Sequence, residues 1–383
     1  MHVDNSDNKV LRLNNFEDFG PSRLKLLKHI ENDCLEYLVS VGYSYVDPPI
    51  LESADLFLKK SLGSTSSSTY TFMDLENRLV SMRPDFTASV IRLIFDNYKE
   101  ESFISKACYS GPVFRYEPAT SDSVQLYQVG AEFLGQKGNK SDLELLSNSI
   151  KCLDLVGIKN YKIDLGHVGI VRELILQKGF GNSIAELVLN NLQNFYEKDW
   201  EENLIFKAKQ LNLINLNNKE KDSLIPEDIL SKYKDKLSSD LGMRAQEDII
   251  NRFVSKVASQ VTIEEIKECI NLVKKIMNMS IKEFLNNDNE VNFDSDNCRD
   301  FRNLLGNLQN ILGEERALTL NLTLTRNLAY YNGIVFDIKS DKDIILGGGG
   351  RYDDLPSRLG YDFDQGCLGF AINLTKTTEV IGY

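Results

Sequence analysis

Two strand-like segments carry polar side chains whose spacing suits the binding of a small ligand. The first ends in residues 114–117, which include Arg115, and the second contains Gln128 and Glu132. Side chains in a strand alternate between its faces, so two residues four apart lie on the same face. A glutamate in the otherwise apolar run 129–133 either lies buried against a cation or faces water, and the strand pattern leaves both alternatives open.

A third polar segment lies far along the chain, where Arg326 precedes Tyr330 and Tyr331. An arginine beside two tyrosines is usually ordinary packing, with the charged head reaching water. The run Gly347–Gly350 could bring backbone N–H groups close to a phosphate. Its spacing matches neither of the common glycine-rich nucleotide motifs, however, so a structural turn is the favoured interpretation.

The histidines and cysteines indicate neither a catalytic triad nor a metal site. The six cysteines lie far apart without a C-x-x-C pair, so neither a zinc site nor a disulfide framework is expected. His29 is interpreted as a helix-surface residue, and His167 as part of a strand-to-helix turn. The sequence therefore predicts no metal and no cofactor.

The whole-chain composition narrows the class of protein. Of its 383 residues, 42% are apolar and 26% charged, which is typical of a globular protein. A net charge of -12 argues against a protein whose main task is to grip a phosphate backbone. The polar N-terminus and the lack of a long apolar stretch predict no signal peptide and no membrane span, so the cytoplasm is the expected location.

The elements that must position the polar residues begin with an amphipathic helix over Leu24–Leu38, which Gly42 ends. A short strand at 43–46 follows, then a loop at 61–69 and a hairpin formed by 70–74 and 78–82. A helix is expected from Val90 to Tyr98. Two long strands at 106–114 and 126–134 are joined by a polar loop, and Ser141 with Glu144 suggests a capping box before a helix that Gly157 ends.

The second half changes character. Residues 181–313 show helical segments with little strand signal, and strand signals return at 317–324, 331–338 and 343–346. We therefore predict an α+β core, formed by residues 1–180 and 314–383 and interrupted by a helical insertion at 181–313.

Taken together and in order, these segments resemble the catalytic core of class II aminoacyl-tRNA synthetases, and specifically that of histidyl-tRNA synthetase. The resemblance covers residues 16 to 374 and is weakest in the insertion. It rests on the first motif at 43–51, the amino-acid-binding segment at 70–87 that ends in Arg83-Pro84-Asp85-Phe86-Thr87, the second motif at 111–135, the histidine-specific peptide at 325–333 and the turn at 348–353.

The resemblance implies a mainly antiparallel sheet flanked by helices, a dimer and a histidine pocket. Asp85, Thr87 and Gln128 would meet the α-amino group, and Glu132 and Tyr331 the imidazole. Arg326 would approach the carboxylate, Tyr330 would line the pocket, and Arg115 would face the carboxylate or an α-phosphate. A carboxylate opposite an imidazole favours and orients its N–H donor.

The departures from the synthetase pattern fall mainly on the ATP side. The second-motif loop at 118–125 contains Asp122 and no Arg or Lys, and the Glu-Arg that closes the third motif reads Thr375-Lys376. Transfer to ATP phosphates needs cations that stabilise the developing charge. Within the amino-acid segments, Asn327 and Ala329 replace Gly and Asp, and Asp85 is one methylene shorter than Glu. ATP handling should therefore suffer more than histidine handling.

These losses resemble those of the regulatory subunits of ATP phosphoribosyltransferase, the enzyme that opens histidine biosynthesis. The sequence ends soon after the third motif, so no anticodon-binding domain and no tRNA partner are expected. By this resemblance the chain would be non-catalytic, would dimerise, would pair with a short catalytic subunit in a hetero-oligomer and would sense histidine. The alternative is an enzyme that still activates histidine or charges tRNA, which Lys376 keeps open because a lysine still supplies a point charge.

Overall fold

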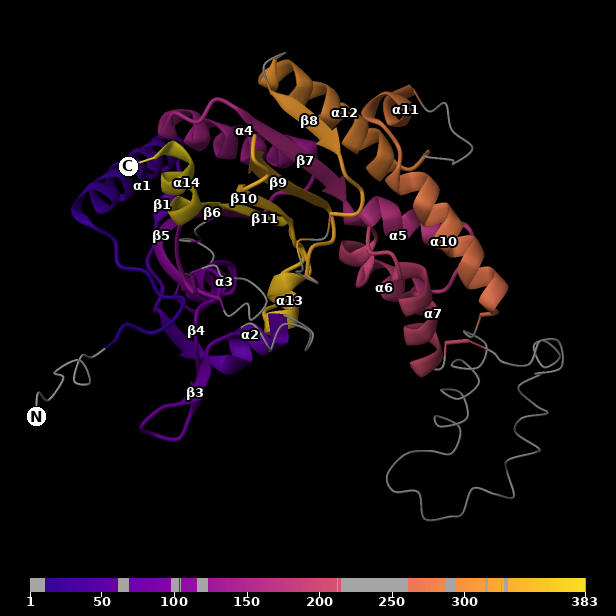
Figure 1. The fold of residues 1–383 in the computed structure, drawn as a ribbon, viewed down its shortest axis with the longest axis horizontal. Helices are drawn as coiled ribbons and strands as arrows, with labels where there is room; N and C mark the ends of the chain where they lie inside the picture. The colour runs from indigo at the N-terminus through magenta and orange to yellow at the C-terminus, as the bar shows by residue number, and fades with distance from the viewer. Residues whose placement is uncertain are drawn as a thin grey trace, which may run out of the picture. The chain divides into compact units, whose positions relative to one another are not determined.

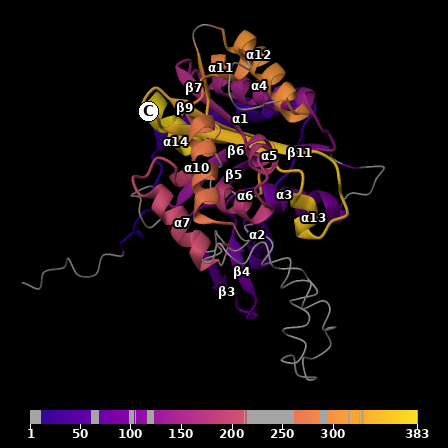
Figure 2. The ribbon, with the colours of Figure 1, turned by 90° about the vertical axis from the view of Figure 1, so that its right-hand side faces the viewer.

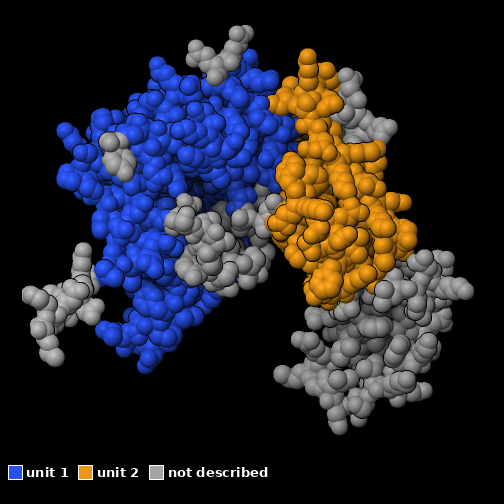
Figure 3. Space-filling view, viewed as in Figure 1, with its two compact units in different colours: residues 1–167, 294–383 blue, residues 168–293 orange. Residues whose placement is uncertain are grey.

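The computed structural model describes residues 11–60, 69–97, 103, 105–115, 123–211, 213–214, 261–286, 294–313, 316–324, 326 and 330–382. The chain divides into two compact units. Unit 1 comprises residues 1–167 and 294–383, and unit 2 comprises residues 168–293 (Figure 3).

Unit 1 is organised around a mixed sheet whose inner pairings are all antiparallel (Figure 1). Only the outermost described pairs, β1 with β5 and β7 with β8, run parallel. The predicted α+β fold with a mainly antiparallel sheet is confirmed. In sheet order the strands are β1 (Ser44–Tyr45), β5 (Lys106–Phe114), β6 (Gln125–Leu134), β11 (Cys367–Asn373), β10 (Ile345–Arg351), β9 (Ile334–Ser340), β7 (Tyr161–His167) and β8 (Ala317–Leu320).

One face of this sheet is covered by α1 (Pro21–Ser40), α4 (Asn139–Val156) and α12 (Asp296–Leu312), which pack side by side (Figures 1 and 2). The predicted amphipathic helix is α1, and its buried side presents Leu27, Ile30, Cys34 and Leu38 at helical spacing. The last helix, α14 (Leu374–Ile381), also packs against α1.

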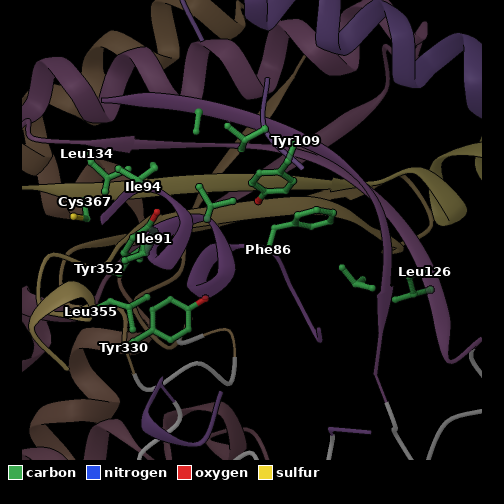
Figure 4. Packing of buried hydrophobic residues seen from close by; sticks show 14 residues of the cluster. Phe86, Ile91, Ile94, Tyr109, Leu126, Leu134, Tyr330, Tyr352, Leu355 and Cys367 are labelled. Atoms are coloured by element: carbon green, nitrogen blue, oxygen red, sulfur yellow. The ribbon is translucent and has the colours of Figure 1, made fainter. Parts of the chain in front are cut away.

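The opposite face is covered by α3 (Thr87–Asn97), with α13 (Leu355–Leu359) beside it. Buried apolar side chains of α3 and β5 form a continuous cluster that reaches Tyr330 and Tyr352 (Figure 4). Within it, the rings of Phe86 and Tyr109 stack with centroids 4.2 Å apart. This cluster fixes the start of α3 against β5, next to the polar face of β6.

A second, three-stranded sheet contains β2 (Leu51–Ser53), β4 (Leu79–Met82) and β3 (Thr71–Met73), and α2 (Ala54–Lys60) follows β2. Strands β3 and β4 pair antiparallel, which confirms the predicted hairpin. Its turn is closed by Asp74, whose carboxylate accepts from Arg78, and Asn77 adopts a positive φ of 59°. Most of the loop predicted at 61–69 lies outside the described residues.

Two local predictions were wrong. Gly347–Gly350 lie inside β10 rather than in a turn. Glycine is needed in this strand because its neighbours approach closely: a Cβ on Gly347 would stand only 2.7 Å from the carbonyl oxygen of Ala371. The capping box before α4 is also absent. Gly138 occupies the N-cap, Ser141 Oγ donates to the Gly138 carbonyl at 2.8 Å, and Glu144 pairs with Lys106 instead.

Unit 2 is helical in its described residues and corresponds to the predicted insertion. Unit 2 spans residues 168–293, whereas the insertion was predicted at 181–313; α12, which lies inside the predicted range, packs on α4 of unit 1 and buries Phe301, Leu304 and Leu308. Within unit 2, α10 packs against α5 and α7 (Figure 2). The helices are α5 (Val168–Gln177), α6 (Asn182–Leu189), η4 (Leu192–Asn194), α7 (Trp200–Gln210), α10 (Ile263–Met277) and α11 (Ile281–Asn286). Across the described part of the chain, no helix has the length and apolar character needed to cross a bilayer.

Candidate functional site

The centre of the candidate site is the carboxylate of Glu132 on β6, which is 1% exposed. Three hydroxyl groups donate to it. Thr87 Oγ1 and Tyr109 Oη lie 2.8 and 3.0 Å from Oε1, and Tyr352 Oη donates to Oε2. The open choice between a buried and an exposed Glu132 is thus decided for burial. Its immediate partners include hydroxyl donors, which orient the carboxylate as a hydrogen-bond acceptor.

Burial keeps the hydroxyl groups of Tyr109 and Tyr352 protonated. Burial raises the pKa of Tyr109 and of Tyr352 well above the usual value, and the neighbouring Glu132 charge raises both further. The opposite strand leaves room for the carboxylate, since a Cβ on Gly369 would overlap Glu132 Oε2. Gly369 is the direct register partner of Glu132.

Arg326 lies over Gly348 of β10, on the same face of the sheet. Its backbone has a φ of 51°, a left-handed conformation that non-glycine residues seldom adopt. Its Nη1 donates to the carbonyl oxygens of Phe336 at 3.0 Å and Gly347 at 3.4 Å, and to the carboxylate of Asp337. The guanidinium fits because Gly348 has no side chain, as a Cβ there would overlap Nη1. Arg326 Nε is buried and has no hydrogen-bond partner among the described residues.

Gln128 provides a hydrogen-bond acceptor, whereas Arg326 Nε is a donor. The residue is 5% exposed, and its Oε1 is buried without a hydrogen-bond partner among the described residues. Buried polar atoms are nearly always satisfied in native proteins, so an unsatisfied acceptor and an unsatisfied donor call for an explanation. A zwitterionic amino acid would satisfy both, because its ammonium donates to Gln128 Oε1 and its carboxylate accepts from Arg326 Nε.

The sheet register brings these groups together on one face. Gln128 and Glu132 lie on β6 two rows apart, and Gly130 between them lies in the row of Ala371 and Gly348, against which Arg326 packs. The next row contains Glu132, Gly369 and Gly350. A Cβ on Gly350 would stand 2.9 Å from the ring of Tyr331. Small residues therefore form a floor across three strands, with the polar groups around it.

The remaining predicted residues lie at the start of α3 and beside Arg326. Asp85 Oδ1 accepts from the Thr87 backbone N–H at 3.1 Å, and Arg115 Nε donates to the Pro84 carbonyl at 2.9 Å. The rings of Tyr330 and Tyr331 are 4.7 Å apart. Burial raises the pKa of Tyr331 to about 12, so this hydroxyl also stays protonated.

Three residues of the site were not predicted from the sequence. Tyr109 and Tyr352 bind Glu132, and Asp337 binds Arg326. Tyr109 lies in the predicted strand 106–114, and Asp337 is the only charged residue of the run 334–338. That buried aspartate was the available signal, since a charge within an apolar strand needs a partner.

The third motif has a different environment. Thr375 is fully buried at the start of α14, and its Oγ1 accepts from the Tyr127 backbone N–H at 2.9 Å. The Lys376 ammonium lies 3.4 Å from Glu379, one turn along the helix. Arg23 of α1 also binds Glu379, at 3.0 Å, and donates to the Thr375 carbonyl. The loop residue Asp122 and the substituted positions Asn327 and Ala329 lie outside the described residues.

The two described histidines, His29 and His167, lie outside this site. His29 lies on the exposed side of α1, as predicted, and His167 ends β7. Burial, together with the charge of Arg351, lowers the pKa of His167 to about 4. The six cysteines are free and buried, and no group of potential metal ligands occurs among the described residues.

The geometry can now be compared with known proteins. A family model described as histidyl-tRNA synthetase matches residues 15–215 and 233–377. The chain belongs to the histidyl-tRNA synthetase family. The fold of the chain is of the class II synthetase type.

Relatives within this family have two kinds of name. A histidine–tRNA ligase of Sulfolobus acidocaldarius is 27% identical over 95% of this chain and 73% of its own length. An ATP phosphoribosyltransferase regulatory subunit of Caldanaerobacter subterraneus subsp. tengcongensis is 25% identical over 94% of this chain and 80% of its own.

Solved structures show the same fold. A protein described as an ATP phosphoribosyltransferase regulatory subunit/histidyl-tRNA synthetase from Bacillus halodurans C matches with a TM-score of 0.68 and 19% identity, covering 97% of this chain and 83% of that one. A chain of the HisG:HisZ ATP phosphoribosyl transferase complex from Thermotoga maritima matches with a TM-score of 0.56 and 18% identity, covering 93% of this chain and 98% of that one.

Proposed function

We propose that this chain is a non-catalytic regulatory subunit of ATP phosphoribosyltransferase that binds histidine around Glu132. The observation that carries the proposal is a contrast between two parts of unit 1. Buried polar atoms at the amino-acid end, Gln128 Oε1 and Arg326 Nε, lack protein partners, whereas Thr375 and Lys376 at the third motif bind other protein groups. Such a site suits a free amino acid better than ATP.

Histidine fits the chemistry of the amino-acid end. Gln128 Oε1 would accept from the α-ammonium, with Asp85 and Thr87 close by, and Arg326 Nε would donate to the carboxylate. Glu132 would accept from an imidazole N–H, because its hydroxyl partners hold it as an oriented acceptor. Tyr331 and Tyr330 would border the ring, and Arg115 would lie at the carboxylate end.

The third motif supports the absence of adenylate formation. Stabilising a pentavalent phosphoryl group requires cations directed at its oxygens. Thr375 has no charge, and the Lys376 ammonium lies beside Glu379. Each missing electrostatic donor costs on the order of a hundredfold in rate.

The partner is proposed from the relatives. Several are named ATP phosphoribosyltransferase regulatory subunits, and one structural neighbour comes from a HisG:HisZ complex. The chain would bind a short-form catalytic subunit, activate it and transmit inhibition by histidine, and it would form a homodimer within this hetero-oligomer. The first motif, with exposed Ile50 and Leu51, is the surface offered for the dimer.

Co-expression with the short phosphoribosyltransferase of the same genome tests the proposal. We expect the two chains to co-purify, phosphoribosyl-ATP formation to depend on this chain, and histidine to inhibit the complex. Wild-type chain alone should show no histidine-dependent exchange of pyrophosphate into ATP. Failure to associate at micromolar concentration, combined with such exchange, would favour a histidine-activating ligase, the alternative supported by Lys376 and by the relatives named ligases.

A further inference from the structure

Arg326 is held by a buried counter-ion on the neighbouring strand. Asp337 of β9 is 6% exposed, and its carboxylate binds Arg326 Nη1. The same nitrogen reaches the carbonyls of Phe336 and Gly347. Nη1 is therefore occupied by the protein, whereas the buried Nε has no hydrogen-bond partner among the described residues.

The neighbourhood of Asp337 explains why this pair must form. Asp337 and Asp164 are direct register partners in the β9–β7 pair, so their side chains lie on the same face. Two like charges placed opposite each other repel. Each carboxylate has its own cation, because Asp164 binds Lys339 Nζ at 2.5 Å while Asp337 binds Arg326.

We infer that Asp337 is a positioning residue for recognition of the ligand carboxylate, acting through Arg326. The inference rests on the proposed binding of an amino acid. Asp337 holds one edge of the guanidinium against β9 and β10. The left-handed backbone of Arg326 and the space over Gly348 restrict the position of that edge. The opposite edge, with Nε, then faces the ligand in one orientation, as bidentate recognition of a carboxylate requires.

The test separates carboxylate recognition from general damage to the pocket. Titration calorimetry would measure the binding of histidine and of histidinol, which carries a hydroxymethyl group in place of the carboxylate. For Asp337→Ala we expect the Kd for histidine to rise about tenfold or more, and that for histidinol to stay within about twofold. Asp337→Asn keeps an oxygen acceptor for Nη1 and should fall between wild type and Asp337→Ala, and it also serves if Asp337→Ala folds poorly.

Asp164→Asn is the matched control. It removes a carboxylate of equal burial, 7% exposed, from the directly opposite position of the same sheet, but one that binds Lys339. Its melting temperature should fall as that of Asp337→Asn does, whereas its Kd for histidine should stay within about twofold of wild type. If Asp164→Asn weakens histidine as much as Asp337→Asn does, Asp337 has no particular role and the inference is overturned.

A double-mutant cycle supplies the second measurement. Because Asp337 acts only through Arg326, the Arg326→Ala protein and the Arg326→Ala/Asp337→Ala protein should bind histidine equally weakly. Additive losses would contradict the inference, as would equal weakening of histidine and histidinol in Asp337→Ala. A wild-type protein that binds neither ligand would instead overturn the proposed histidine site itself, so the two failures are distinguishable.

Discussion

The proposed amino-acid end of the site, formed by Gln128, Glu132 and Arg326, and the third motif both involve strands of the central sheet of unit 1, yet they use polar groups differently. At the amino-acid end, Glu132 collects three hydroxyl donors and Arg326 is fixed by Asp337. The groups are buried and oriented, and Gln128 Oε1 has no hydrogen-bond partner among the described residues. At the third motif, Thr375 and Lys376 form local hydrogen bonds and ion pairs of the kind that hold a helix onto a sheet.

This contrast distinguishes polar groups that a binding site would need from polar groups that only stabilise the fold. Orienting a buried carboxylate with three hydroxyls, and placing an arginine in a left-handed backbone, costs stability, and such features persist where function needs them. The third motif shows neither feature in the described residues: Thr375 and Lys376 bind protein groups, while the buried Thr377 Oγ1 has no hydrogen-bond partner among the described residues. The following experiments test whether the two ends differ as this contrast requires.

The largest effect is expected for Glu132→Ala. It removes the acceptor of three buried hydroxyls, those of Thr87, Tyr109 and Tyr352, and each orphaned donor costs about 1 to 3 kcal/mol. The free energy of unfolding, measured with urea, should fall by about 3 kcal/mol or more, and histidine binding should be lost.

Glu144→Ala is the control for this substitution. It removes a partly exposed carboxylate that binds Lys106, and it should cost less than about 1 kcal/mol. Equal losses of stability in the two variants would mean that the hydroxyl network around Glu132 contributes no more than a surface ion pair, and the contrast between the two ends would weaken.

A smaller effect is expected at the third motif, where two buried threonines give opposite predictions. Thr375→Val removes the acceptor of the Tyr127 N–H and should cost about 1 kcal/mol. Thr377→Val removes a buried hydroxyl that has no hydrogen-bond partner in the described structure, so it should be neutral or stabilising. Both variants should bind histidine with wild-type affinity in calorimetry. Weakened histidine binding in Thr375→Val would show that this end also serves the ligand.

Much of the fold could be predicted from the sequence, because local patterns were strong. The periodicity of α1 and the strand-like character of 106–114 and 126–134 predicted elements that the structure confirms as α1, β5 and β6. The prediction of a turn at the glycines of β10 was wrong, because the contacts that require glycine there come from residues distant in the sequence. Gly348 is required by a guanidinium 22 residues earlier in the sequence, and Gly369 by a carboxylate on a neighbouring strand. Composition alone cannot distinguish this close packing from a turn.

The candidate site was predicted chiefly through family resemblance, and the partners of its charges were not. Gln128 and Glu132 could be placed on one face by the strand period, and Thr87 was added by the family resemblance; the structure joins Thr87 to Glu132 directly. Asp337 and Tyr352 were missed because pairing across a sheet depends on register, and register between distant strands is not visible in a single sequence. The role of each predicted residue in binding histidine stays a prediction.

The smallest effect is expected for Lys376→Ala, and it tests the comparison most directly. Lys376 stands where a synthetase has the arginine of its third motif, and its ammonium lies 3.4 Å from Glu379 in a partly exposed i,i+3 pair. Such pairs contribute at most about 0.5 kcal/mol, and Glu379 would keep Arg23 as a partner, so stability should hardly change. Histidine affinity and activation of the catalytic subunit should be unchanged as well, because neither proposal assigns Lys376 a ligand.

The decisive measurement is ATP binding by calorimetry on wild type and variant. If wild type binds ATP and Lys376→Ala binds it at least tenfold more weakly, the lysine still serves a phosphate, and the third motif belongs with the amino-acid end as a retained site.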